Sequence, residues 1–244
     1  MFMPVDKSAT WGTGNPVAAG RKRRDLLELS VGYGLILLVI WTSSPWQRWF
    51  YWAAVAWILL VTALSFNGWK AMGLGISGFW RSLWVVGVAL LVVAVAVSLA
   101  SSFHTLHMPH DPVMFVRRFW GYGIWALLQQ FLLQDFVLLH LLRLLPGRMA
   151  AVIGAAGLFA LAHVPNPILT PAALIWGSAA CLIFLKYRNV YTLGIAHAIF
   201  GICIAIAVPG PMDHNMRVGH GYSTYRSHRR HHLNHAALPL RKAA

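Results

Sequence analysis

Acidic residues are scarce in this 244-residue sequence. Asp and Glu together number 6 against 20 Lys and Arg, and the one glutamate is Glu28. Charged residues of both signs make up only 11% of the chain and hydrophobic residues 58%, a composition typical of proteins embedded in lipid. The two cysteines, Cys181 and Cys203, lie in apolar segments and are expected to pack as small apolar residues, which excludes a disulfide framework. The net charge of +14 is explained largely by basic loops and requires no nucleic-acid partner.

Long apolar runs predict an all-α, polytopic membrane protein. Several runs reach about 18–22 residues, the length that crosses roughly 30 Å of hydrocarbon, and lipid favours helices over open strands. We predict about seven transmembrane helices, at 29–44, 47–66, 80–101, 119–142, 149–164, 171–186 and 190–208. The predicted domains are a polar N-terminal lead-in at 1–28, in which Pro16 and Gly20 discourage a helix, a helical membrane domain at 29–208, and a basic His- and Arg-rich tail at 209–244.

Basic residues predict that the N-terminus lies inside, because Lys and Arg favour cytoplasmic loops. With that orientation the inner cations are Lys7, Arg21, Lys22, Arg23, Arg24, Lys70, Arg81, Arg143, Arg148, Lys186 and Arg188. The outer loops hold Arg48, Arg117 and Arg118. Seven helices place the basic tail outside, against the same rule, so a helix count that differs by one stays an alternative.

The predicted span 119–142 carries an unusual set of polar side chains. Gln129, Gln130, Gln134, Asp135 and His140 follow one another closely, and polar residues inside a membrane helix usually face a protein interior or a cavity. At about 100° per residue, Gln130 and Gln134 share a face, Asp135 points away from both, and His140 lies nearly below Gln129. Hydrogen bonds between helices are one explanation of these amides, and a functional site is the other.

Two histidines follow in later predicted spans. His163 is held near a membrane boundary, because Pro165 and Pro167 stop the helix just after it. His197 lies within the last span. A single histidine of this kind is usually a packing residue, but two of them facing a glutamine cluster favour a site and make His163 and His197 candidate metal ligands.

The order and spacing of these residues resemble the CPBP family, which includes the CAAX prenyl endopeptidases and bacterial abortive-infection proteins. That family of intramembrane metalloproteases carries Glu-Glu-x-x-x-Arg, Phe-x-x-x-His and His-x-x-x-Asn in successive spans. Phe159 and His163 match the second motif, and His197 matches the first position of the third. The resemblance covers 119–208 and implies a CPBP-like core in the last four helices, in a protein of the bacterial inner (cytoplasmic) membrane.

The departures from the family pattern bear on its chemistry. The family's glutamates correspond to Gln129 and Gln130, its arginine to Gln134 and its asparagine to Gly201. One family glutamate is thought to activate water, and a carboxamide cannot serve as a general base. Loss of the asparagine removes an expected oxyanion donor. The resemblance thus implies a protease-like site without glutamate-dependent proteolysis. The family-equivalent positions are Gln129, Gln130, Gln134, His163 and His197.

Three functional hypotheses follow from this site. In the first, the intramembrane cavity binds a hydrophobic or prenyl-like ligand, or a partner helix, within the membrane lipids. In the second, the protein is a metal-dependent membrane enzyme, a peptidase or a lipid-processing enzyme, with zinc or iron on His163 and His197; Asp135 could complete an iron site. In the third, it is a structural subunit of a larger membrane assembly.

Two histidine-rich segments outside the predicted spans leave further alternatives. The loop with His104, His107 and His110, beside Asp111, is either a lid or metal site or a set of solvated histidines. The tail at 209–244 is either a solvated end or a segment that binds anionic headgroups or an acidic partner.

Overall fold

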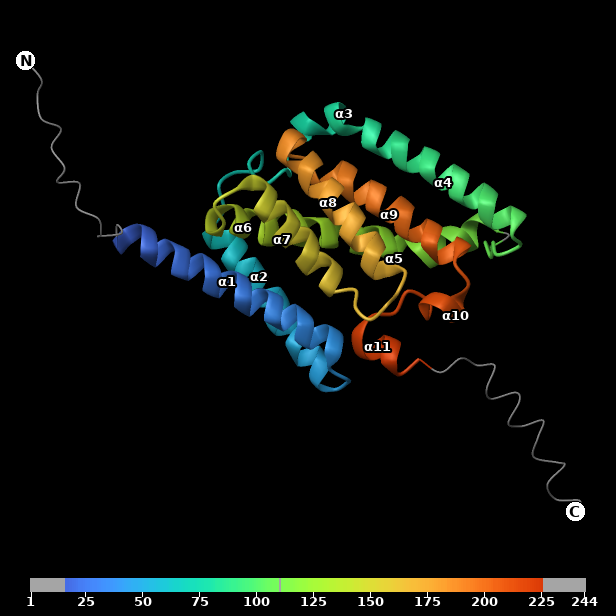
Figure 1. Cartoon of the computed structure of the whole chain (residues 1–244), viewed down its shortest axis with the longest axis horizontal. Helices are drawn as coiled ribbons and strands as arrows, with labels where there is room; N and C mark the ends of the chain where they lie inside the picture. The colour runs from blue at the N-terminus through green and yellow to red at the C-terminus, as the bar shows by residue number, and fades with distance from the viewer. Residues whose placement is uncertain (1–15, 110, 226–244) are drawn as a thin grey trace, which may run out of the picture.

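The structure is a computed structural model that describes residues 16–109 and 111–225 (Figure 1). Helices and their connections make up this part of the chain, which confirms the predicted all-α class. The long helices are α1 (Pro16–Trp41), α2 (Trp46–Leu64), α4 (Trp84–Ser102), α5 (Pro112–Phe131), α7 (Arg148–Leu161), α8 (Leu169–Tyr187) and α9 (Val190–Ala207). The short ones are η1 (Ile76–Gly78), α3 (Phe79–Ser82), η2 (Leu132–Leu138), α6 (Leu139–Leu144), α10 (Gly210–Asp213) and α11 (Gly219–Ser223).

Five helices of the described chain are long and apolar enough to cross a membrane: α2, α4, the continuous helix Pro112–Leu144, α8 and α9. The other two predicted spans do not qualify. α7 has 14 residues, or about 21 Å of helix, and α1 carries the basic run 21–24 in its first half. The polytopic membrane architecture is therefore confirmed, and the predicted count of seven is not.

α1 begins earlier than the sequence predicts. Pro16 and Gly20 do not prevent a helix, and the helix that holds the predicted span 29–44 starts at Pro16. Proline suits the first turn of a helix, where its missing N–H has no partner in any case, and the following Arg, Lys and Leu residues favour helix formation. Residues 16–28 are therefore helical, and residues 1–15 lie outside the described part of the chain.

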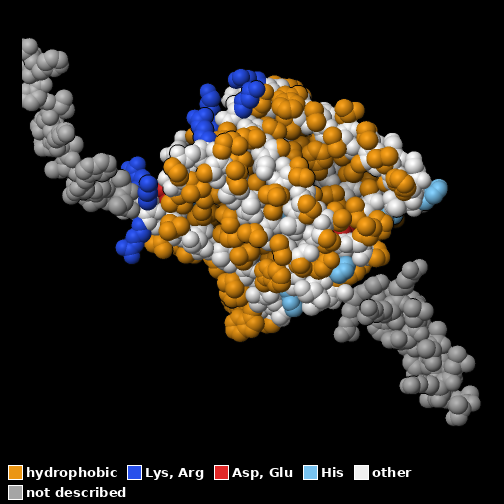
Figure 2. All heavy atoms as spheres, viewed as in Figure 1, with side chains coloured by type: hydrophobic (Ala, Val, Ile, Leu, Met, Phe, Trp, Pro, Cys, Tyr) orange, Lys and Arg blue, Asp and Glu red, His pale blue; other side chains and the backbone are white. Residues whose placement is uncertain are grey.

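The helices form a bundle with an attached hairpin (Figure 1). α9 packs between α4 and α5, and α7 packs along α8. α1 pairs with α2 and contacts the bundle through α6 and α11, whereas α2 contacts it through η2. Figure 2 shows hydrophobic side chains over most of the visible face, with Lys and Arg gathered where α1 begins and near α3. Such extensive apolar exposure suits contact with lipid.

The core is centred on η2. Leu133 and Phe136 are almost completely buried, in one cluster with Val152 of α7 and Phe184 of α8. α7 and α8 approach closely because Gly177 has no side chain: a Cβ there would lie 3.1 Å from Phe159 and 3.4 Å from the Cα of Ala156. Small residues allow this kind of close packing in membrane helices.

The first part of the predicted tail packs against the bundle. Asn166, fully buried, accepts hydrogen bonds from the backbone N–H groups of Ile168 and Leu169, where α8 begins. Its amide nitrogen donates to the carbonyl oxygens of Asp213 and Arg217, at 2.7 and 3.0 Å. This one side chain therefore joins the α7–α8 turn to the segment that contains α10 and α11. The tail beyond residue 225 lies outside the described chain.

Candidate functional site: a cavity between the hairpin and the bundle

A cavity of about 630 Å³ lies between the α1–α2 hairpin and helices α5, α7, α8 and α9. This volume is in the range of small-molecule sites, roughly 300–1,000 Å³. Its walls are mostly aliphatic and aromatic side chains, and residues 215–218 contribute to one side. Besides the tryptophans Trp125 and Trp176, the lining side chains with nitrogen donors or acceptors are Arg118, Gln129, His163, His197 and Asn215, joined by the hydroxyls of Tyr33, Tyr51 and Tyr122. No aspartate or glutamate of the described chain lines it.

A chain of side-chain hydrogen bonds leads to His197 from the continuous helix of α5 and η2. The amide nitrogen of Gln134 donates to Oε1 of Gln130 at 3.2 Å, and Nε2 of Gln130 donates to Nδ1 of His197 at 3.1 Å. Both glutamines are fully buried. The sequence predicts that Gln130 and Gln134 share a face and point toward the histidines, and the structure places them so. Gln129 lines the cavity directly.

A π-helical segment explains why the polar residues after Gln130 face different parts of the protein. η2 contains Gln134 and Asp135, and its i→i+5 hydrogen bonds make wider turns than an α-helix. The α-helical register that put His140 below Gln129 is therefore wrong: His140 contacts Glu28 instead of the cavity. Asp135 is 7% exposed, does not line the cavity, and has no hydrogen-bond partner for either carboxylate oxygen in the described chain.

His163 lies in the turn that ends α7. Its Nδ1–H donates to the carbonyl oxygen of Phe159 at 2.7 Å, which fixes the ring toward the cavity that it lines. The Phe159 ring packs edge-on against both histidines, with centroids 4.8 Å from His163 and 5.8 Å from His197. The structure thus brings the two predicted histidines to one wall.

Tyr122 occupies the space beside Gly201, a relation that the sequence analysis missed. A Cβ on Gly201 would overlap the hydroxyl oxygen and two ring carbons of Tyr122. Both residues line the cavity. The tyrosine therefore fills the place that a side chain at position 201 would take. The sequence signal that could have indicated this packing is Gly201, a residue without a side chain one helical turn after His197.

Trp176 provides a further polar group in the wall. It lines the cavity beside His197, with ring centroids 6.4 Å apart. Its buried indole N–H has no hydrogen-bond partner in the described chain. Buried donors are nearly always paired in proteins, but this one is enclosed by protein atoms and so gives the cavity no accessible donor.

The residues present do not fit a catalytic zinc or iron site. Such sites take three protein ligands, most often histidines with a carboxylate or further histidine. Here His163 and His197 are the two imidazoles of the cavity, no carboxylate of the described chain lines it, and Nδ1 of His197 accepts from an amide. Asp135 does not line the cavity that contains His163 and His197. The iron site of these three residues, considered from the sequence, is therefore not assembled.

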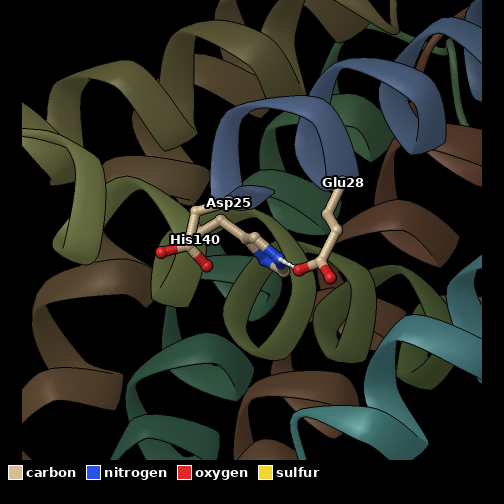
Figure 3. Close-up of side chains that lie close together, drawn as sticks. All are labelled: Asp25, Glu28 and His140. Atoms are coloured by element: carbon tan, nitrogen blue, oxygen red, sulfur yellow. Dashed lines mark hydrogen bonds and ion pairs between the residues drawn. The ribbon is translucent and has the colours of Figure 1, made fainter. Parts of the chain in front are cut away.

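A second polar cluster joins α1 to α6 and was not predicted. Figure 3 shows Asp25 and Glu28 of α1 on either side of His140. Their ligand atoms lie within 4.8 Å of one another, and all three residues are buried. His140 Nδ1–H donates to the Phe136 carbonyl oxygen at 2.6 Å, and its Nε2 lies 3.2 Å from a carboxylate oxygen of Glu28. The one glutamate of the chain is thus part of a contact between two helices.

Two arginines compensate the carboxylates of this cluster. Arg24 pairs with Glu28 at 2.6 Å and Arg143 with Asp25 at 2.8 Å. Burial opposes ionisation of Glu28, but hydrogen bonds from Arg24 and His140 outweigh it, and the pKa of Glu28 is lowered from its ordinary value. With an arginine paired to each carboxylate and His140 bonded to Glu28, the cluster is an interhelical ion-pair network.

The histidine loop does not join the cavity. His107 donates its backbone N–H to Ile206 at the end of α9, and its ring contacts the carbonyl oxygen of Thr105. His104 and His107 do not line the cavity, and His110 lies outside the described residues. The lid and metal hypotheses for this loop therefore stay predictions.

Comparison with protein families matches residues 119–203 to the family described as Type II CAAX prenyl endopeptidase Rce1-like. The match contains η2, α7 and α8, most of α5 and α9, and the two histidines. It confirms the CPBP resemblance that the motifs predict. No curated protein and no solved structure matches the chain.

Proposed function

Since residues 119–203 are an Rce1-like core, we propose that this integral membrane protein uses the core's cavity to bind a hydrophobic ligand and does not carry out glutamate-dependent proteolysis. The ligand is a lipid with a long apolar chain, of the prenyl or similar kind. Binding in place of hydrolysis is the function that the side chains lining the cavity support best.

One observation supports the proposal above all others: the site has hydrogen-bonding groups in an apolar cavity and no carboxylate from the described residues. Glutamate-dependent activation of water requires a carboxylate base, and neither a carboxamide nor a remote aspartate can act as one there. The amide nitrogen of Gln130 is also hydrogen-bonded to His197. What remains is the usual composition of a ligand site, apolar walls with a few placed polar groups.

The surroundings of the cavity suit a ligand taken from the bilayer. α2 contacts the bundle through η2, and both α2 and α5 contribute cavity walls. We place the end that carries Arg21–Arg24, Lys70, Arg81, Lys186 and Arg188 on the cytoplasmic side of a bacterial inner membrane, with the N-terminus inside, because basic residues favour that side. Membrane lipids are the expected partners, and nucleic acid is not.

Lipid analysis of the purified protein tests the proposal. Ala172 lines the cavity, so Ala172→Phe should fill part of it. Ala94 is exposed on α4, and Ala94→Phe is the matched control. After purification in mild detergent, mass spectrometry should find about one bound lipid per chain in the wild type and in Ala94→Phe, and much less in Ala172→Phe. Equal lipid in all three proteins would refute binding in this cavity.

Metal and peptidase assays test the alternative of a metal-dependent enzyme. We expect no stoichiometric zinc or iron in the wild type and no cleavage of a prenylated peptide. Metal that is bound by the wild type and lost in a His163→Ala, His197→Ala double variant would favour the enzyme, and cleavage would establish it. Stoichiometric co-purification of another membrane protein would instead favour a subunit of a larger assembly.

A further inference from the structure

The hydrogen-bond directions at the two histidines specify the headgroup that the cavity recognises. This inference deepens the proposed lipid binding and rests on it. Each imidazole has one ring nitrogen engaged by the protein and the other, Nε2, left for the cavity. In a neutral imidazole one nitrogen carries a proton and the other accepts, so the engaged nitrogen determines what Nε2 offers.

His163 offers an acceptor. Its Nδ1 lies 2.7 Å from the carbonyl oxygen of Phe159. A carbonyl oxygen can only accept, so the proton is on Nδ1 and Nε2 keeps its lone pair.

His197 offers a donor, for the opposite reason. Oε1 of Gln130 is occupied by the amide of Gln134, and Nε2 of Gln130 therefore faces His197. An amide nitrogen can only donate, so Nδ1 of His197 accepts and its proton is on Nε2. A glutamate at 130 would have the reverse effect, because its carboxylate would accept from Nδ1–H and leave Nε2 as an acceptor.

We propose that the cavity selects a long-chain lipid whose uncharged headgroup donates one hydrogen bond to His163 and accepts one from His197, as the hydroxyl of a lipid alcohol does. The imidazole rings of His163 and His197 both pack against the Phe159 ring, and both line the cavity. Trp176 packs beside His197 with ring centroids 6.4 Å apart, but its indole N–H is enclosed by protein atoms, so the two histidines supply the hydrogen bonds to the headgroup.

An anionic headgroup fits this arrangement less well. A phosphate dianion or carboxylate has no proton to donate to His163, and burying its charge in an apolar wall is costly without a matched cation. Arg118 is the cation of the cavity lining, but it is exposed and its guanidinium packs on Phe119, 5.8 Å from the ring centroid. It lies in α5, three turns before Gln129, away from the histidine pair along the helix.

A matched ligand series tests the headgroup. A long-chain alcohol, its methyl ether, its phosphate and the parent hydrocarbon are added to the purified protein in nanodiscs, and quenching of tryptophan fluorescence is followed. The alcohol should bind about two- to tenfold more tightly than the methyl ether, which lacks one hydrogen bond, and the ether more tightly than the hydrocarbon. Tightest binding of the phosphate, or equal binding of alcohol and hydrocarbon, would overturn the headgroup inference while lipid binding stands. Failure of all four to bind would refute lipid binding as well.

Nitrogen-15 NMR of histidine-labelled protein tests the tautomers independently of any ligand. The His197 signals, assigned by their loss in His197→Phe, should show a protonated Nε2, and those of His163 a protonated Nδ1. Gln130→Glu should move the His197 proton to Nδ1 and remove the preference for ether over hydrocarbon, because neither histidine would then donate, while the alcohol could still donate to His163. Gln47→Glu, the same change at an exposed residue that does not line the cavity, should do neither. A wild-type His197 protonated on Nδ1 would overturn the inference whatever binds.

Discussion

Gly201→Ala should destabilise the protein more than any ordinary glycine-to-alanine change in a helix. The added Cβ would overlap the hydroxyl oxygen, Cζ and Cε1 of Tyr122, and ring carbons cannot rotate away as a flexible chain end can. Overpacking of this kind costs about 1–3 kcal/mol. Alanine also gains about 1 kcal/mol over glycine in a helix. The measured change of one variant therefore mixes two effects of opposite sign.

Gly123→Ala separates these effects. Gly123 lies in α5, and a Cβ there would have no neighbour within 4 Å, so this variant reports the helix gain alone. The two variants should differ by the overpacking cost alone, about 1–3 kcal/mol, or about 2–12 °C in Tm for a domain of this size, measured by thermal unfolding in one detergent. In a Tyr122→Ala background, Gly201→Ala should lose its penalty. Equal Tm values for Gly201→Ala and Gly123→Ala would refute the packing of Tyr122 against position 201.

Two further predictions concern buried carboxylates. Glu28→Gln should lower the free energy of unfolding by about 1–3 kcal/mol, chiefly through His140, since Arg24 is 57% exposed and its pair is worth less. Because the folded pKa of Glu28 is lowered, its contribution is present above the unfolded pKa of about 4.3 and is lost as pH falls through the folded value; unfolding at pH 7 and pH 3.5 should show a smaller deficit for the variant at pH 3.5. Asp135→Asn should cost nothing or stabilise by up to about 1 kcal/mol, because the carboxylate has no partner to lose. A clear loss of stability in Asp135→Asn would indicate an ion pair that the structure does not show.

Much of the candidate site could be predicted from local spacing. Gln130 and Gln134 are four residues apart, so they keep a shared face where α5 continues into η2. Phe159 and His163 have the same spacing at the end of α7. Residues that repeat at one helical turn keep their relation whatever the helix packs against.

Other parts of the site depend on relations that local spacing does not contain. His140 contacts Glu28, 112 residues earlier in the chain, because η2 widens the helix and turns the following residues. Tyr122 and Gly201 lie on different helices and meet only where α5 packs along α9. Neither pair repeats with a helical period, so the sequence carried no signal that joined them.

The sequence by itself determined that this protein is helical and lies in a membrane, since lipid imposes long apolar helices on any chain that spans it. It also determined the order of the glutamines and histidines within residues 119–203, the segment that matches the Rce1-like family model. The tertiary structure decided which of these polar side chains meet and in which direction their hydrogen bonds run. Those contacts form where helices that are distant in sequence pack together. A helical period determines which residues share a face of one helix, but not which face of another helix packs against them.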